Sequence, residues 1–135
     1  MAVIKEIIKI EDNCLSFGNY LVAAKQKVNN FQFNGDQYNL RTHDVITRLE
    51  KNDKMILETV PGSTIHKFNF SGDIISFGAE GFENTQITLD LEPNQNYKLE
   101  VDNTVLSTSK SNSFGKFSFS LNLKSDPKSV LIKKV

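Results

Sequence analysis

Hydrophobic and polar residues alternate along most of this chain. The alternation is clearest in NFQFN, KFNFS, QITLDLE, YKLEV and FSFSLNL, where aromatic, β-branched or aliphatic residues occupy every second position. A period of two places successive side chains on opposite faces of an extended backbone, as in a half-buried β-strand. Turn-forming residues separate these runs at Asn34-Gly35-Asp36, Asn52-Asp53, Pro61-Gly62, Ser71-Gly72-Asp73, Pro93-Asn94 and Asp102-Asn103. Many short strands joined by such turns predict an all-β sandwich or barrel.

Two segments leave the type of element open. The stretch VITRLEKNDKMILETV predicts a hairpin around residues 51–53, but residues 42–49 also fit a short helix with Asp44 as its N-cap. The start of the chain, AVIKEIIKI, has the apolar spacing of one helical face, whereas its β-branched residues favour a strand. We expect a strand at the start of the chain.

The triplet SFG occurs three times, at residues 16–18, 76–78 and 113–115. The unequal separations exclude a regular structural repeat, and no further glycines follow to form a phosphate-binding loop. We interpret each glycine as a bulge or strand end that needs a positive φ. A second pair of similar segments, FQFNGD at 31–36 and FNFSGD at 68–73, predicts in each case a strand that ends in F-x-F before a glycine turn.

The segment LEPNQNY contains Leu91, Pro93 and Tyr97 in the spacing of a tyrosine corner, in which the phenol forms a hydrogen bond to the backbone upstream. The second half of the chain thereby resembles fibronectin type III and other immunoglobulin-like modules. A plain proline turn with a core tyrosine is the alternative interpretation. Together with the alternation, this motif predicts one domain over residues 1–135, an antiparallel β-sandwich of immunoglobulin-like or jelly-roll-like form.

The composition narrows the classes of partner and the location. The 135 residues include 16 basic and 16 acidic residues, so the formal net charge is zero and there is no field to recruit nucleic acid or an anionic membrane. No apolar run is long enough to span a membrane, and Lys5, Glu6 and Lys9 interrupt the start, which therefore lacks a signal-peptide core. We expect a cytoplasmic protein by default, with assembly onto a cell, spore or phage surface left open. The sole cysteine, Cys14, is either a small core residue or a thiol that cross-links two copies.

No group of residues predicts catalysis or metal binding. The only histidines are His43 and His66, and the adjacent pair His43-Asp44 would point to opposite faces of a strand. Cysteine and histidine are too few for a zinc site, and they form no recognisable nucleophile motif. The acids of the turns, at positions 36, 53 and 73, lack the spacing of a calcium loop. We therefore predict a protein without enzymatic activity, metal or cofactor.

Across nearly its full length the chain resembles a family of small, uncharacterised proteins of anaerobic Gram-positive bacteria that are often labelled endosialidase. The resemblance lies in LSFGNYLV, FNGDQYNLRTHDVITRLEKND, LETVPGS, QITLDLEPNQNYKLEVD and GKFSFSLNL. The label implies a glycosidase, and enzymes of that kind need paired carboxylates in a cleft. The acids of TLDLE and LEVD instead occupy alternating strand positions, so the resemblance implies a family and no activity.

Two functions are compatible with a sequence that predicts no catalysis and no metal binding. The first is a structural or assembly subunit, or a protein-interaction module, that self-associates through edge or terminal strands at the two ends of the chain. Ordinary edge strands of a monomer, shielded by lysines, are the alternative interpretation of these ends. The candidate assembly residues are Val3, Ile4, Ile7, Ile8, Ile10 and Cys14.

The second function is a carbohydrate-binding module. The chain has no Trp, and we assign its ten Phe residues to the core, so the candidate ligand-binding residues are Tyr20 and Tyr38. The expected partners are therefore further copies of the chain, a larger protein assembly, or a glycan.

Overall fold

The computed structural model of the protein describes residues 7–71, 73–124 and 126–135. Within these ranges the chain forms thirteen β-strands and no helix. The strands are β1 (Ile8–Glu11), β2 (Cys14–Phe17), β3 (Gln26–Phe33), β4 (Asp36–Thr42), β5 (Thr47–Lys51), β6 (Lys54–Val60), β7 (Ser63–Ser71), β8 (Ile74–Gly81), β9 (Asn84–Asp90), β10 (Asn96–Val101), β11 (Thr104–Lys110), β12 (Lys116–Asn122) and β13 (Lys128–Lys134).

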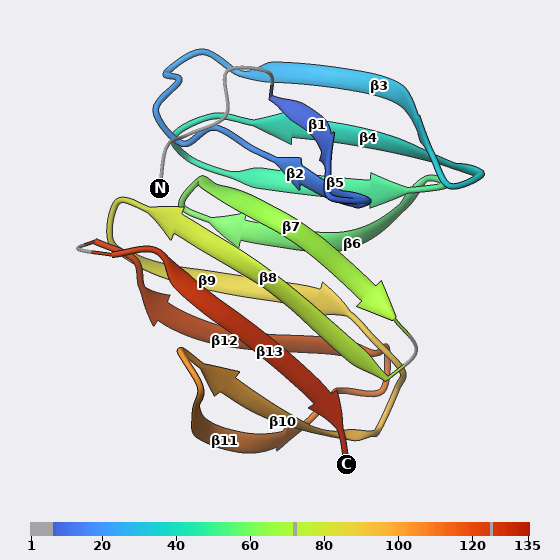
Figure 1. Ribbon diagram of the computed structural model, residues 1–135, viewed down its shortest axis with the longest axis vertical. Coiled ribbons are helices and arrows are strands. Elements are labelled where there is room, and N and C mark those ends of the chain that lie inside the picture. Colours follow the sequence, from blue (N-terminus) through green and yellow to red (C-terminus); the bar gives the residue numbers. More distant parts are fainter. Residues whose placement is uncertain (1–6, 72, 125) are drawn as a thin grey trace.

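The strands form two antiparallel sheets, which confirms the predicted β-sandwich (Figure 1). Sheet A has seven strands in the order β1-β2-β7-β8-β13-β10-β11, and sheet B has six in the order β12-β9-β6-β5-β4-β3. The chain crosses between the sheets after β2, β6, β8, β9, β11 and β12. Because every crossing is a connection at the end of the sandwich, the two sheets cannot separate without unfolding these connections.

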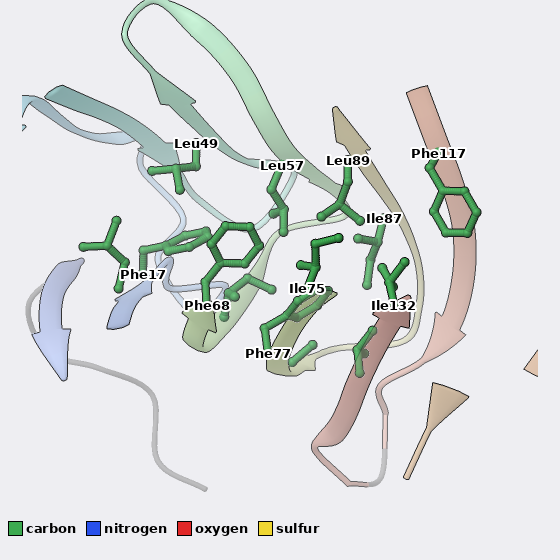
Figure 2. Close-up of a cluster of buried hydrophobic side chains, with 14 of the residues drawn as sticks. Phe17, Leu49, Leu57, Phe68, Ile75, Phe77, Ile87, Leu89, Phe117 and Ile132 are labelled. Atoms are coloured by element: carbon green, nitrogen blue, oxygen red, sulfur yellow. The ribbon is translucent and has the colours of Figure 1, made fainter. Parts of the chain in front are cut away.

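The core lies between the sheets, as the period-two pattern predicts. In β9, Thr85, Ile87 and Leu89 are buried while the residues between them are exposed or half-buried. Figure 2 shows Leu49, Leu57 and Leu89 of sheet B pointing towards aromatic and aliphatic side chains of sheet A, among them Phe68 and Phe77. Burial of such side chains removes apolar surface from water and is the main stabilising contribution to a sandwich of this size.

Four hairpins share one kind of turn. The loops Asp12-Asn13, Asn34-Gly35, Asn52-Asp53 and Asp102-Asn103 each have two residues, both with positive φ. Positive φ at both positions is the requirement of a type I′ turn, whose twist matches that of the flanking strands. Asn, Asp and Gly tolerate this conformation, which explains why these pairs stand at the turns.

The structure decides between the two alternatives for residues 42–49. Strands β5 and β6 form the hairpin around Asn52-Asp53, and the short helix is wrong. The apolar spacing that suggested a helix comes from Val45, which is 59% exposed in a loop, together with Leu49, which is buried in β5. A loop residue and a strand residue thus imitated one helical face.

The two ends of the chain differ in their positions. Strand β1 is an edge strand of sheet A, so the N-terminal strand prediction holds for residues 8–11, whereas the candidates Val3 and Ile4 lie outside the described residues. The prediction of an edge position for the C-terminal strand is wrong, because β13 lies between β8 and β10 and pairs with both. Its alternating Val130 and Ile132 are buried, so this strand belongs to the centre of the sheet.

The SFG glycines do not share one role. Gly18 and Gly115 flank strand ends and have φ of 89° and 87°, as predicted. Gly78 lies inside β8, where it pairs with His66 beside a bulge of β7, so the strand-end interpretation is wrong for this copy. Two of the three triplets therefore lie at strand ends, and the third lies in the interior of a strand.

The hydrogen bond predicted for the tyrosine corner is present. The backbone N–H of Glu92 donates to the Tyr97 hydroxyl oxygen at 3.1 Å, and the Tyr97 ring is buried against Phe117. The loop between β9 and β10 also contacts the loop before β12, since the N–H of Leu91 donates to the carbonyl of Gly115. These contacts fix the connection of the two sheets at this point.

Buried hydroxyl groups connect the sheets at the opposite end of the sandwich, called the loop end below, where the chain passes from β2 to β3, from β4 to β5 and from β6 to β7. Thr47 Oγ1 lies 2.8 Å from Thr42 Oγ1 and donates to the carbonyl of Ser63 at 2.9 Å. Thr59 Oγ1 lies 2.7 Å from Ser63 Oγ, and Thr64 Oγ1 donates to the carbonyl of Gly18. These hydroxyls are fully buried, and each satisfies a polar group that would otherwise be costly to bury.

The two glycines Gly35 and Gly115 provide a matched pair for testing the loop contact. Both have positive φ, but a Cβ at Gly35 would meet nothing within 4 Å, whereas a Cβ at Gly115 would lie 2.2 Å from the carbonyl oxygen of Leu91. We predict that Gly35→Ala costs about 1–2 kcal/mol of unfolding free energy from backbone strain. Gly115→Ala should cost about 1–3 kcal/mol more, because the loops must also separate. Urea unfolding of both variants measures the difference, and equal losses would contradict the contact.

Candidate functional site

Strand β11 is the most open element of the described chain. It pairs only with β10, so one row of its backbone N–H and C=O groups has no strand beside it (Figure 1). All seven of its residues are exposed, which means that neither face is covered by sheet B. Val105 and Leu106 are 53% and 55% exposed. An open edge of this kind is a template for strand addition.

The other edge strands are less suited to pairing. Strand β1 has only four residues, and Lys9 and Glu11 form an ion pair on it. Strand β3 carries a bulge between Val28 and Phe31, where Asn30 has positive φ. Strand β12 is regular but is covered on one face, since Phe117 is buried. Short length, charge and bulges are devices that protect sheet edges. Strand β11 also has a bulge, but it is the edge strand whose residues are all exposed.

Positive charge further distinguishes the β3 edge. Lys27 lies directly opposite Arg41, which in turn lies opposite Arg48 on β5. Glu50 and Glu58 contact Arg48 at 3.2 and 2.7 Å and balance its charge. Edge-to-edge pairing at β3 that placed Lys27 opposite Lys27 of a second copy would bring like charges together, which opposes that register.

The predicted assembly residues of the N-terminal strand are mostly committed to the fold. Ile8 is buried, and Ile7 packs against the core from a half-buried position. Ile10 is 52% exposed, and Cys14 is half-buried at the start of β2. Of these four residues, Ile10 alone presents a largely exposed apolar side chain, so β1 offers little apolar surface to a neighbour.

A pocket of about 260 Å³ opens between the sheets at the turn end, which is the end that carries the turns Asp12-Asn13 and Asn34-Gly35. Its apolar wall includes Phe33 and Tyr38 of sheet B and Phe70 of sheet A. The Phe33 and Tyr38 rings are 6.2 Å apart, and Phe70 is 50% exposed at the rim. The two similar segments FQFNGD and FNFSGD thus each contribute a ring to one pocket, a placement that the sequence did not indicate.

Polar groups surround these rings. The Asn52 side-chain amide donates to Asp36 Oδ1 at 2.9 Å, and the Lys51 ammonium lies 3.5 Å from Asp36 Oδ2. The hydrogen bond from Asn52, supported by the Lys51 charge, holds the pKa of Asp36 below its usual value. Burial, together with the nearby Asp36 charge, raises the pKa of Tyr38. The pocket therefore contains a balanced ion pair and a neutral phenol at neutral pH.

The structure separates the two tyrosines proposed as ligand-binding residues. Tyr38 is only 7% exposed and lines the pocket at the turn end. Tyr20 lies at the loop end, where its ring meets Phe82 edge to face at 4.8 Å. Burial and the Glu80 charge raise the pKa of Tyr20. The two residues therefore cannot belong to one binding site.

The assignment of all ten Phe residues to the core is wrong for three of them. Phe70, Phe82 and Phe114 are 50%, 42% and 80% exposed. Each lies at the end of a strand or in a loop, where alternation no longer predicts which side is buried. Flat aromatic surface is therefore available at the ends of the sandwich despite the absence of Trp.

The outer face of sheet A has a shallow groove of about 560 Å³ with charged residues at its rim. His66 Nε2 lies 3.1 Å from Glu80 Oε1, and both side chains are nearly buried. Lys67 and Asp12 form an ion pair at 2.8 Å, which lowers the pKa of Asp12. Ser16 donates a hydrogen bond to Glu11 and so lowers the pKa of that carboxyl. These groups engage one another, as expected of a structural polar face.

Other chemistry is limited in the part of the chain that the structure describes. No group of three or more His, Cys, Asp or Glu side chains there could hold a metal ion. His43 and Asp44 lie in a loop and not on a strand, with Nδ1 and Oδ1 3.5 Å apart, so the opposite-faces argument does not apply to them. No helix in the described ranges is long and apolar enough to cross a membrane.

The His66–Glu80 contact can be tested as a structural element. We predict that His66→Ala costs about 1–3 kcal/mol of unfolding free energy, because it leaves the nearly buried Glu80 carboxylate without its partner. The double variant His66→Ala/Glu80→Ala should cost less than the sum of the two single variants, since the pair interacts. Strictly additive losses in a double-mutant cycle would show that the contact contributes nothing.

Comparison of the chain with models of known protein families, with curated proteins and with solved structures gives no match. The resemblance to the small family of anaerobic Gram-positive bacteria stays a prediction. The two features of the structure that bear on function are the open edge of β11 and the pocket at the turn end.

Proposed function

We propose that the protein is a non-catalytic assembly subunit whose copies join by antiparallel pairing of their β11 strands. The observation that supports this proposal is the full exposure of β11 on both faces together with its unpaired edge. Pairing with a second copy would satisfy the open backbone groups and would extend sheet A from one copy into the next.

The side chains of β11 are compatible with such pairing. The strand TVLSTSK contains β-branched residues, no Pro and no Gly, and its only charge is Lys110 at the end. If the twofold axis passes near Thr108, the two Thr108 side chains face each other and Ser107 faces Ser109 of the second copy. No like charges then lie opposite each other, and the contact is isologous, as in most homodimers.

A bulge limits the length of the contact. Leu99 pairs with Ser107 and Glu100 with Val105, so Leu106 has no partner in β10. A bulge increases the local twist and leaves Ser107–Lys110 as the regular part of the strand. Such a short pairing buries less surface than a standard interface, so we expect association that depends strongly on protein concentration.

Charge substitutions at Thr108 test the proposal. We predict that wild-type protein shifts from monomer to dimer between micromolar and millimolar concentration in light scattering. Thr108→Lys and Thr108→Glu should each remain monomeric, because like charges would face across the axis, and an equimolar mixture of the two should regain the dimer.

The matched control is Ser120→Lys on β12, the neighbouring edge strand. This substitution also places a lysine at an exposed strand position, and it should leave dimerisation unchanged. A wild-type monomer at every concentration, or equal loss of association in Ser120→Lys, would overturn the pairing through β11.

A further inference from the structure

The pocket at the turn end has the composition of a ligand site and is separate from β11. It opens between β2 and β7 of sheet A and β3 to β6 of sheet B, whereas β11 is the fourth strand beyond β7 in sheet A. Whatever the pocket binds therefore does not depend on pairing through β11. Its volume of about 260 Å³ is slightly below the roughly 300 Å³ of the smallest common ligand pockets, which suits a single ring.

Three side-chain amides at the pocket have unused hydrogen-bonding capacity. Asn13 and Asn34 extend from two hairpin turns, and Asn69 extends from β7. Within the described part of the chain, the side chains of these three residues make no hydrogen bond. Each amide offers two donor hydrogens and one acceptor oxygen, which can serve a ligand whose groups both donate and accept, such as hydroxyls.

The aromatic walls complement these amides. Phe33, Tyr38 and Phe70 present apolar ring surface on two sides, and Phe70 keeps half of its surface exposed at the entrance. A molecule with an apolar C–H face and a rim of hydroxyl groups would satisfy both kinds of surface. Apolar walls with a few convergent polar groups are the usual features of a small-molecule site.

The charges of the pocket indicate the charge of the ligand. Asp36 and Lys51 lie together at 3.5 Å, so the one carboxylate and the one ammonium balance each other. An anionic ligand would have to compete with Asp36 for Lys51, and a cationic ligand would have to compete with Lys51 for Asp36. A neutral ligand leaves the ion pair intact.

We propose that this pocket binds a neutral saccharide, with one sugar ring between Phe70 and the rings of sheet B and its hydroxyls on the amides of Asn13, Asn34 and Asn69. The site uses Tyr38 of the two tyrosines considered from sequence and excludes Tyr20. Among the described residues that line the pocket, the cation Lys51 is paired with Asp36, so this site differs from a sialic-acid site, which needs a cation to receive a carboxylate.

Binding to a glycan array that carries neutral and sialylated oligosaccharides tests the class of ligand. The probe is the 135-residue chain with Thr108→Lys, so that self-association through β11 does not affect the result. We expect binding to one or more neutral glycans. The affinity for the corresponding monosaccharide, drawn from glucose, galactose, mannose, rhamnose and N-acetylglucosamine, is then measured by NMR titration.

Two substitutions with matched controls test the site. Phe70→Ala and Asn69→Ala should each weaken binding roughly three- to tenfold, as expected for loss of one ring contact or one set of hydrogen bonds. Neither position has positive φ, so neither substitution changes a constrained backbone. Phe114→Ala and Asn29→Ala remove the same side chains from exposed positions outside the pocket and should leave binding unchanged.

Several outcomes would overturn the proposal. These are absence of binding to every neutral glycan, binding of sialylated glycans alone, and binding that Phe70→Ala and Asn69→Ala do not weaken. Selection of extended peptides from a peptide library, with loss of that binding in Phe70→Ala and no sugar binding, would assign the pocket to protein recognition instead.

Discussion

The buried hydroxyl network at the loop end holds the two sheets in one arrangement, and the rest of the structure depends on it. Thr47 and Thr59 belong to sheet B, whereas Ser63 is the first residue of β7 in sheet A, so their hydrogen bonds with Ser63 cross between the layers, and Thr42 supports Thr47 within sheet B. A hydrophobic core tolerates sliding of one sheet over another better than a set of directional bonds does, because apolar contacts have no preferred angle. The aromatic pocket lies at the other end of the sandwich, between residues of the two sheets.

The unequal size of the sheets explains the open edge. Sheet A has one strand more than sheet B, and β11 is the strand of sheet A that no strand of sheet B covers. The two proposed activities thus occupy separate parts of one scaffold: a lateral edge for contact between copies and a turn end for a sugar. In a dimer joined through β11, the turn ends would stay accessible, and the two pockets together would bind a glycan surface more tightly than one pocket alone.

Much of the fold was predictable because alternation and turn chemistry are local signals. The strands around Ile87 and Leu99 and the turn at Asn52-Asp53 follow from residues that are neighbours in the sequence. Pairing order is not local, and for this reason the central position of β13 was missed. The hydroxyl network was missed because a threonine at a strand end has the same appearance in sequence whether it faces water or the interior. The pocket was also missed, since only folding brings residues 31–36 and 68–73 together.

The exposure of β11 also has a consequence for the distribution of stability within the molecule. A strand that covers no core is held only by its hydrogen bonds to β10, so its amide protons should exchange with solvent far faster than those of β13, which is paired on both sides. The element available for recognition is therefore also the element that opens most easily. Local opening of β11 leaves the core intact, so the protein can lose and regain this edge while the remainder stays folded.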